Sequence, residues 1–73
     1  MFSRRLNEVR HSRGIPAVRM AEYLEIDLRT YRYYESGKRR PSLEMLVRIA
    51  DYLDVSLDYL LCRDEFIEKN REK

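Results

Sequence analysis

The stretch that decides the fold is MAEYLEIDLRTYRYYESGKRRPSLEMLVRIADYLDVSLDYLL, residues 20–61. Its apolar side chains recur at the three- and four-residue spacing of amphipathic helices, and Gly, Pro, Asp and Ser stand at the breaks between them. The whole chain has only two Gly and two Pro among 73 residues, a composition that favours helices over strands. We therefore expect an all-α fold.

The breaks predict five helices. They run over about 4–13, 16–24, 28–36, 43–53 and 57–61. A short polar side chain can accept a hydrogen bond from the first free backbone N–H groups of a helix, so N-caps are expected at Ser3, Asp27, Ser42 and Ser56. Left-handed backbone is expected at Gly14 and Gly37, where helices end.

The helices have distinct inner and outer faces. In the fourth, a buried stripe is expected from the spacing of Leu43, Leu46, Ile49, Ala50 and Leu53. In the third, Tyr31 and Tyr34 are expected to point inward. The opposite side of that helix then carries Leu28, Arg29, Arg32 and Tyr33.

One domain is expected over residues 1–61, with a charged tail over 62–73. Phe66 and Ile67 are the only large apolar residues of that tail. It either frays or forms a sixth helix if these two side chains find a surface to cover.

Several classes of function are disfavoured by composition. One Cys excludes an intrachain disulfide and the multi-cysteine zinc patterns. Neither a clustered acid–base set nor a Gly-rich phosphate loop occurs, so we expect no enzyme, cofactor or metal. His11 is expected to be an exposed helix residue, and Cys62 a half-buried apolar filler, with a redox sensor as its alternative. Because no apolar run reaches the roughly 20 residues of a membrane span, and no secretory signal is present, a cytoplasmic protein is expected.

Charge is distributed unevenly along the chain. Residues 1–41 hold ten Lys and Arg against five acids, whereas residues 42–73 hold five against eight. A basic half beside an acidic half indicates one side that faces a polyanion. An ordinary mixed surface remains the alternative on this observation alone.

The order of residues over about 4–61 resembles the Cro and repressor type of helix-turn-helix domain, also called the Xre type. The resemblance is carried by Ala21, Leu24 and Ile26 around the turn and by Glu35-Ser36-Gly37-Lys38 at the end of the third helix. It continues through Pro41-Ser42-Leu43, Leu46, Ile49-Ala50, Leu53, Val55-Ser56-Leu57 and Leu60. It implies a five-helix phage-repressor fold and a DNA-binding transcriptional regulator, whose third helix enters the major groove.

The same resemblance implies which residues meet DNA. By position these are Leu28, Arg29, Arg32 and Tyr33 on the recognition helix, and Lys38, Arg39 and Arg40 in the following loop. Arg29 is the strongest candidate for a base reader, because a guanidinium can bond guanine O6 and N7 together. The three loop cations suit phosphate contacts. Solvated charges are the alternative for the arginines of the helix and for the loop cations. Partial burial is the alternative for Leu28, and packing across the surface is the alternative for Tyr33.

Three further expectations rest on the resemblance. Glu25 replaces the usual Gly in the turn before the third helix, so it must either adopt a left-handed backbone or reshape the turn, at a cost of about 1 kcal/mol. Arg10 and Glu35 occupy the positions of an internal ion pair with a structural role. Pro16-Ala17 replaces the usual Ser-Gln, so Ala17 lies at the DNA-facing start of the second helix without the amide that commonly touches phosphate.

The sequence leaves two roles open. The first is a regulator, acting as a repressor, that binds a palindromic operator in double-stranded DNA as a homodimer, at least when on DNA. The second is an antitoxin or other protein-interaction module with the same fold. Phe66, Ile67 and Tyr59 are the expected dimer contact, with packing onto their own core as the alternative.

Overall fold

The computed structural model describes residues 2–62 of the chain, and within them it contains five helices and no strand. They are α1 (Phe2–Ser12), α2 (Ala17–Leu24), α3 (Leu28–Ser36), α4 (Leu43–Leu53) and α5 (Leu57–Leu60). The all-helical prediction is confirmed. Among the described residues, none of the helices has the length and apolar character needed to cross a membrane. The predictions for Phe66, Ile67 and the rest of 63–73 lie outside the described residues.

Three of the four predicted N-caps are confirmed. The side chains of Asp27, Ser42 and Ser56 each accept a hydrogen bond from the backbone N–H three residues later, at 2.8, 3.1 and 3.1 Å. The prediction for Ser3 is wrong. Helix α1 already begins at Phe2, whose side chain packs against the core, so Ser3 lies inside the first turn.

Three helix boundaries also differ by one residue from those expected. Helix α1 ends at Ser12 and not at Arg13. Pro16 has an extended backbone and is itself the N-cap of α2, which therefore begins at Ala17. Helix α5 ends at Leu60, and Leu61 lies outside it.

The turns adopt the predicted left-handed backbone. Gly14 and Gly37 have φ of 68° and 83°, and Glu25 has φ of 58°. Glu25 donates its backbone N–H to the carbonyl of Glu22 at 3.2 Å, and Ile26 donates to Ala21 at 3.0 Å. These bonds close the carboxyl end of α2 and offset the strain of a non-glycine residue in this conformation.

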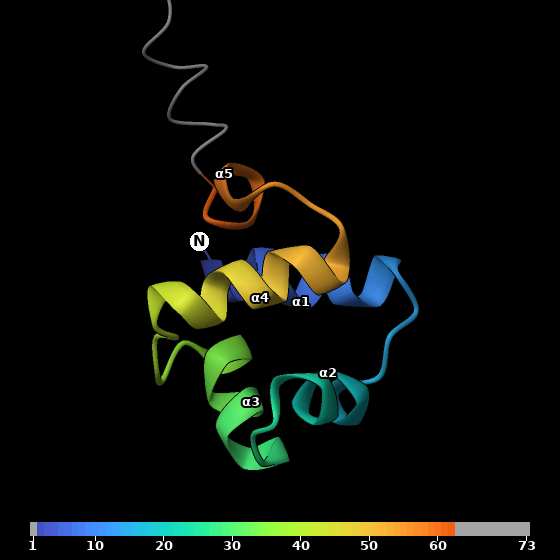
Figure 1. Cartoon of the computed structure of the whole chain (residues 1–73), viewed down its shortest axis with the longest axis vertical. Coiled ribbons are helices and arrows are strands. Elements are labelled where there is room, and N and C mark those ends of the chain that lie inside the picture. The colour runs from blue at the N-terminus through green and yellow to red at the C-terminus, as the bar shows by residue number, and fades with distance from the viewer. Residues whose placement is uncertain (1, 63–73) are drawn as a thin grey trace, which may run out of the picture.

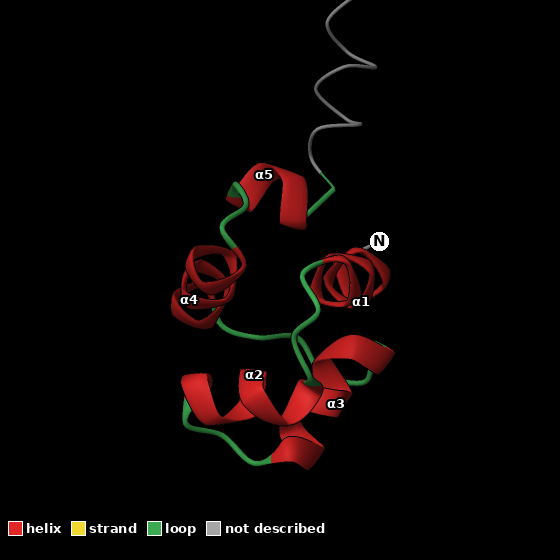
Figure 2. Cartoon of the chain, turned by 90° about the vertical axis from the view of Figure 1, so that its right-hand side faces the viewer, coloured by secondary structure: helices red, strands yellow, loops and turns green. Residues whose placement is uncertain are grey.

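The helices are arranged in three levels. In Figure 1, α1 and α4 cross the middle of the molecule, α5 lies at one end, and α2 and α3 lie at the other. Figure 2 shows α1 and α4 end on, side by side, with α2 and α3 beneath them. Helix α3 packs against α1 and α2, and α5 packs against α1 and α4. Helix α3 therefore lies at the end of the domain opposite α5.

A single apolar cluster holds these levels together. Its fully buried side chains come from all five helices: Leu6, Met20, Leu24, Tyr31, Ile49, Leu53 and Leu60. Leu43 does not join them, since 69% of its surface is exposed, and Leu46 is only partly buried. The predicted α4 stripe is thus wrong at Leu43. This residue is the first of α4, directly after the Ser42 cap, and its side chain lies on the solvent-facing side of the helix.

Arg13 joins the end of α1 to the end of α4. Its Nε donates to the carbonyl oxygen of Leu53 at 2.9 Å, and Nη2 donates to that of Asp54 at 3.4 Å. A cation at this place complements both the unpaired carbonyl groups and the negative end of the helix dipole.

Candidate nucleic-acid interface

Helices α2 and α3 are joined by a tight turn that lets them pack closely. Ala21, with 3% of its surface exposed, lies in α2 where it faces the core shared with α3. A small side chain allows the helix axes to approach. This packing of α2 against α3 leaves one side of α3 free to enter a groove about 12 Å wide.

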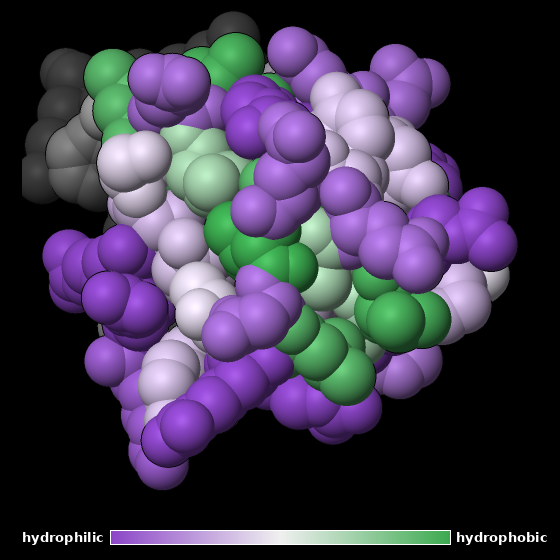
Figure 3. Space-filling view, turned by 60° about the horizontal axis from the view of Figure 1, so that its bottom comes forward, coloured by the Kyte–Doolittle hydropathy of each residue, from purple (hydrophilic) through white to green (hydrophobic). Residues whose placement is uncertain are grey.

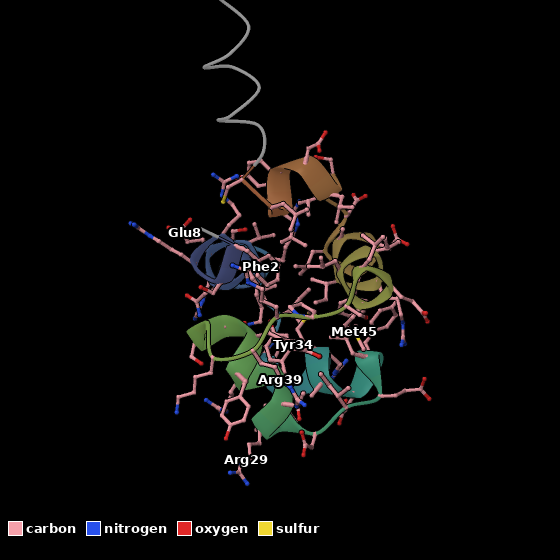
Figure 4. The ribbon with its side chains drawn as sticks, turned by 90° about the vertical axis from the view of Figure 1, so that its left-hand side faces the viewer. Phe2, Glu8, Arg29, Tyr34, Arg39 and Met45 are labelled. Carbon is pink, nitrogen blue, oxygen red and sulfur yellow. The ribbon has the colours of Figure 1, made fainter. Side chains whose placement is uncertain are left out.

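Helix α3 has one buried and one exposed side. Tyr31 and Tyr34 are 0% and 7% exposed and pack edge to face, with their ring centroids 6.5 Å apart. Arg29 and Arg32 are exposed, and Tyr33 is partly buried. Figure 4 shows Arg29 extending from the outer end of α3, away from the body of the protein.

Two of the residues expected at the interface are turned partly toward the core. Leu28 at the start of α3 and Ala17 at the start of α2 are both half-buried and pack against the apolar cluster. Each therefore supports the seating of its helix, and each offers only part of its surface to an outside molecule.

The loop after α3 presents the three successive cations. Lys38, Arg39 and Arg40 are all exposed, and the buried Pro41 anchors the loop to the domain. The backbone N–H of Arg39 donates to the carbonyl oxygen of Tyr33 at 3.3 Å. This bond folds the loop back along α3, so the loop cations and the exposed arginines of α3 belong to one region.

The end of the molecule formed by α2 and α3 is largely hydrophilic. Figure 3 brings this end forward and shows polar side chains over most of it, with apolar patches between them. Among the described residues, no group of three or more His, Cys, Asp or Glu side chains is placed to hold a metal ion. The region is suited to polyanion binding through its cations.

Tyr33 organises two of these cations. The Nε of Arg29 donates to the Tyr33 hydroxyl at 2.9 Å, and the guanidinium carbon lies 5.7 Å from the ring centroid. The Nζ of Lys38 lies 5.5 Å from the same centroid. The sequence interpretation placed these residues in one region but missed their contacts, although the four-residue spacing of Arg29 and Tyr33 was a usable signal.

Glu35 anchors α3 to α1 from the buried side. Arg10 reaches it with Nε at 2.5 Å and Nη2 at 3.2 Å, and the two side chains are only 11% and 12% exposed. Asn7 donates to the same carboxylate at 2.8 Å, and the Tyr31 hydroxyl is a further donor. Arg10 also donates to the carbonyl oxygen of Ile15 at 2.8 Å. The Arg10–Glu35 contact was expected from the resemblance, whereas Asn7 and Tyr31 were missed.

The ionisation of this cluster follows from its surroundings. Burial disfavours the charged carboxylate, but hydrogen bonds from Arg10, Tyr31 and Asn7 outweigh it, so the pKa of Glu35 lies below its usual value. Burial and the hydrogen bond to Glu35 raise the pKa of Tyr31 well above its usual value. The hydrogen bond to Glu35 likewise raises the pKa of Arg10. At neutral pH the cluster therefore holds a carboxylate, a guanidinium and a neutral phenol.

Comparison with known proteins gives one family for this arrangement. The family model described as helix-turn-helix matches residues 6–60, which include all of α2, α3, α4 and α5 and most of α1.

Individual relatives agree with the family model. An SPbeta prophage-derived HTH-type transcriptional regulator of Bacillus subtilis, YonR, is 43% identical over 61 residues, which cover 84% of this chain and 56% of the relative. The cryptic phage CTXphi transcriptional repressor RstR of Vibrio cholerae is 43% identical over 53 residues, covering 73% and 46%. This chain spans about half the length of these relatives.

A solved structure has the same fold. The crystal structure of a transcriptional regulator from Listeria innocua matches with a TM-score of 0.77 and 26% identity. The match covers 100% of this chain and 78% of that one.

Proposed function

Since this chain belongs to the helix-turn-helix family, of the Cro and repressor type, we propose that it is a sequence-specific DNA-binding transcriptional regulator, acting as a repressor. In this proposal α3 enters the major groove of double-stranded DNA. Arg29 and Arg32 face base edges, and Lys38, Arg39 and Arg40 contact phosphates. Leu28 and Ala17 seat the two helices and border the interface.

The observation that carries the proposal is the division of α3 into two sides. Its inner side carries Tyr31, Tyr34 and the Glu35 cluster, whose side chains contact other parts of the protein. Its outer side and the following loop carry five exposed cations, and no described acid lies within ion-pair distance of these five. Phosphate contacts supply affinity, and base contacts supply sequence preference.

The proposal includes a homodimer on a palindromic operator. One recognition helix covers about half of a usual site, and two copies related by a two-fold axis would place their α3 helices one helical turn, about 34 Å, apart. Helix α5 lies at the opposite end of the domain from α3, so a partner there would leave the DNA-facing side open. Tyr59 of α5 is 42% exposed, with the Arg5 guanidinium 4.3 Å from its ring centroid, and in this proposal it contributes to that contact.

The antitoxin alternative has less support. The relatives are named as transcriptional regulators or a repressor, and the cations of α3 and its loop have a direct use on DNA. A regulator of this kind works where the genome is, which in a bacterium is the cytoplasm.

Selection from a pool of random duplexes tests the proposed function. We expect enrichment of one sequence motif with inverted symmetry. Sedimentation of the enriched duplex at saturating protein is expected to give two chains per site. No enriched motif would overturn the sequence-specific function, and one chain per symmetric site would overturn the dimer alone.

A further inference from the structure

The side chain of Tyr33 interacts with the strongest base-reading candidate in a way that the proposed function does not require. Its hydroxyl accepts a hydrogen bond from Nε of Arg29, one helical turn earlier. Its backbone carbonyl accepts hydrogen bonds from the Ser36 hydroxyl and the Arg39 backbone N–H, both at 3.3 Å. Tyr33 is therefore fixed at its backbone and connected to Arg29 at its tip.

The ring of Tyr33 is also held. Lys38 stands 5.5 Å from the ring centroid and the Arg29 guanidinium 5.7 Å from it, both within the range in which a cation is attracted to an aromatic face. The half-buried ring thus lies between two exposed cations, one from α3 and one from the loop. These contacts restrict both the ring and the guanidinium.

The Arg29 atom that bonds Tyr33 determines which Arg29 donors remain free to bind DNA. Nε is the donor to Tyr33, whereas the two terminal Nη groups take no part in that bond. Those two groups form a fork that fits two acceptors in one plane. In the major groove, guanine offers such a pair, N7 and O6, on one base edge.

We propose that Tyr33 is a positioning residue that fixes Arg29 for end-on contact with a guanine, through Nη1 and Nη2, and does not itself bind DNA. This inference rests on the proposed function. A long side chain loses conformational freedom when it binds, and holding it beforehand lowers that loss. By holding Arg29 in place, Tyr33 therefore raises both the affinity for DNA and the preference for guanine at the base pair that Arg29 reads.

The test is a double-mutant cycle on the enriched duplex. Kd is measured for the wild type, Tyr33→Phe, Arg29→Ala and the double variant. The duplexes carry guanine or 7-deazaguanine, which lacks N7, at the position where Arg29→Ala relaxes preference. Tyr33→Phe keeps the ring and removes only the hydroxyl, and Tyr52→Phe on α4 is the matched control.

We expect Tyr33→Phe to weaken binding of the guanine duplex about threefold to tenfold, the worth of one hydrogen bond. It should weaken the 7-deazaguanine duplex less, and change nothing further in the Arg29→Ala background. Tyr52→Phe should leave Kd unchanged. Equal losses with and without Arg29 would overturn the inference, since Tyr33 would then touch DNA directly. An unchanged Kd for Tyr33→Phe would overturn it as well.

A measurement without DNA separates this inference from the proposed function. In the free protein, Tyr33→Phe is expected to speed solvent exchange of the Arg29 Nε–H, followed by NMR, while the melting temperature stays within about 2 °C. An unchanged exchange rate would overturn the positioning role even if DNA binding is specific. The opposite result is fast exchange in the variant together with no enriched motif. The fast exchange would support the Arg29–Tyr33 contact, whereas the missing motif would overturn both the guanine assignment and the proposed function.

Discussion

The Tyr31 hydroxyl donates a hydrogen bond to Oε2 of Glu35, one turn later on the same helix, and both residues face α1. The carboxylate thereby gains a donor from its own helix in addition to Arg10 and Asn7. An acid near a proposed polyanion site would be unfavourable if it faced outward. Here it is turned inward and neutralised, and it fixes how α3 lies on the domain.

Glu35→Ala is expected to destabilise the fold by about 3–5 kcal/mol, because Arg10 would keep a charge with little access to water and no oppositely charged partner. Chemical denaturation measures the loss. Glu8→Ala is the control, since Glu8 forms an exposed pair with Arg4 and should cost less than about 0.5 kcal/mol. If the losses of Glu35→Ala and Arg10→Ala simply add in the double variant, the two residues are not coupled.

Acid should weaken the fold partly through Glu35. Its pKa is lowered in the folded state, so its contribution is complete above the unfolded pKa of about 4.3 and is lost as pH falls through the folded pKa. The free energy of unfolding is therefore expected to fall as the pH drops below about 4.3. Glu35→Gln should flatten that fall. Asp27→Asn provides the comparison, because the pKa of Asp27 is also lowered, by hydrogen bonds from Thr30. Identical pH profiles for wild type and Glu35→Gln would contradict the assignment.

The sequence predicted the helices well because capping residues and helical spacing are local signals. It failed at Ser3 and Leu43, where the extent of the core decides the outcome. Phe2 reaches the core and lengthens α1, and Leu43 does not reach it and stays exposed. The contact of Asn7 with Glu35 depends on how α3 packs against α1, which the order of residues does not reveal. The four-residue spacing of Arg29 and Tyr33 allows their contact, but it does not determine the side-chain conformations that form it.

Arg29→Ala is expected to weaken binding to the enriched duplex by about 1–3 kcal/mol and to relax preference at one base pair. The reason is its exposure at the outer end of α3. Fluorescence anisotropy with specific and random duplexes measures both effects. Arg4→Ala on α1 is the matched control, because it also removes an exposed arginine. Losses of the same size on both duplexes would show that Arg29 reads no base.

Arg39→Ala and Arg40→Ala should weaken binding to all duplexes alike, because phosphate contacts carry no sequence information. Each change is expected to lower the slope of log K against log salt by about one unit. Binding titrations at several salt concentrations measure this. A slope that stays at the wild-type value would mean that these exposed side chains face solvent in the complex.

The central claim is that α3 and the loop after it are the surface that meets DNA. It is tested most directly by NMR titration of the full chain with the duplex enriched from the random pool, following every backbone amide. We expect the largest shifts in residues 28–33 and 38–40, with smaller ones at the start of α2. Shifts confined to α4 and α5, with the amides of α3 unmoved, would contradict the account.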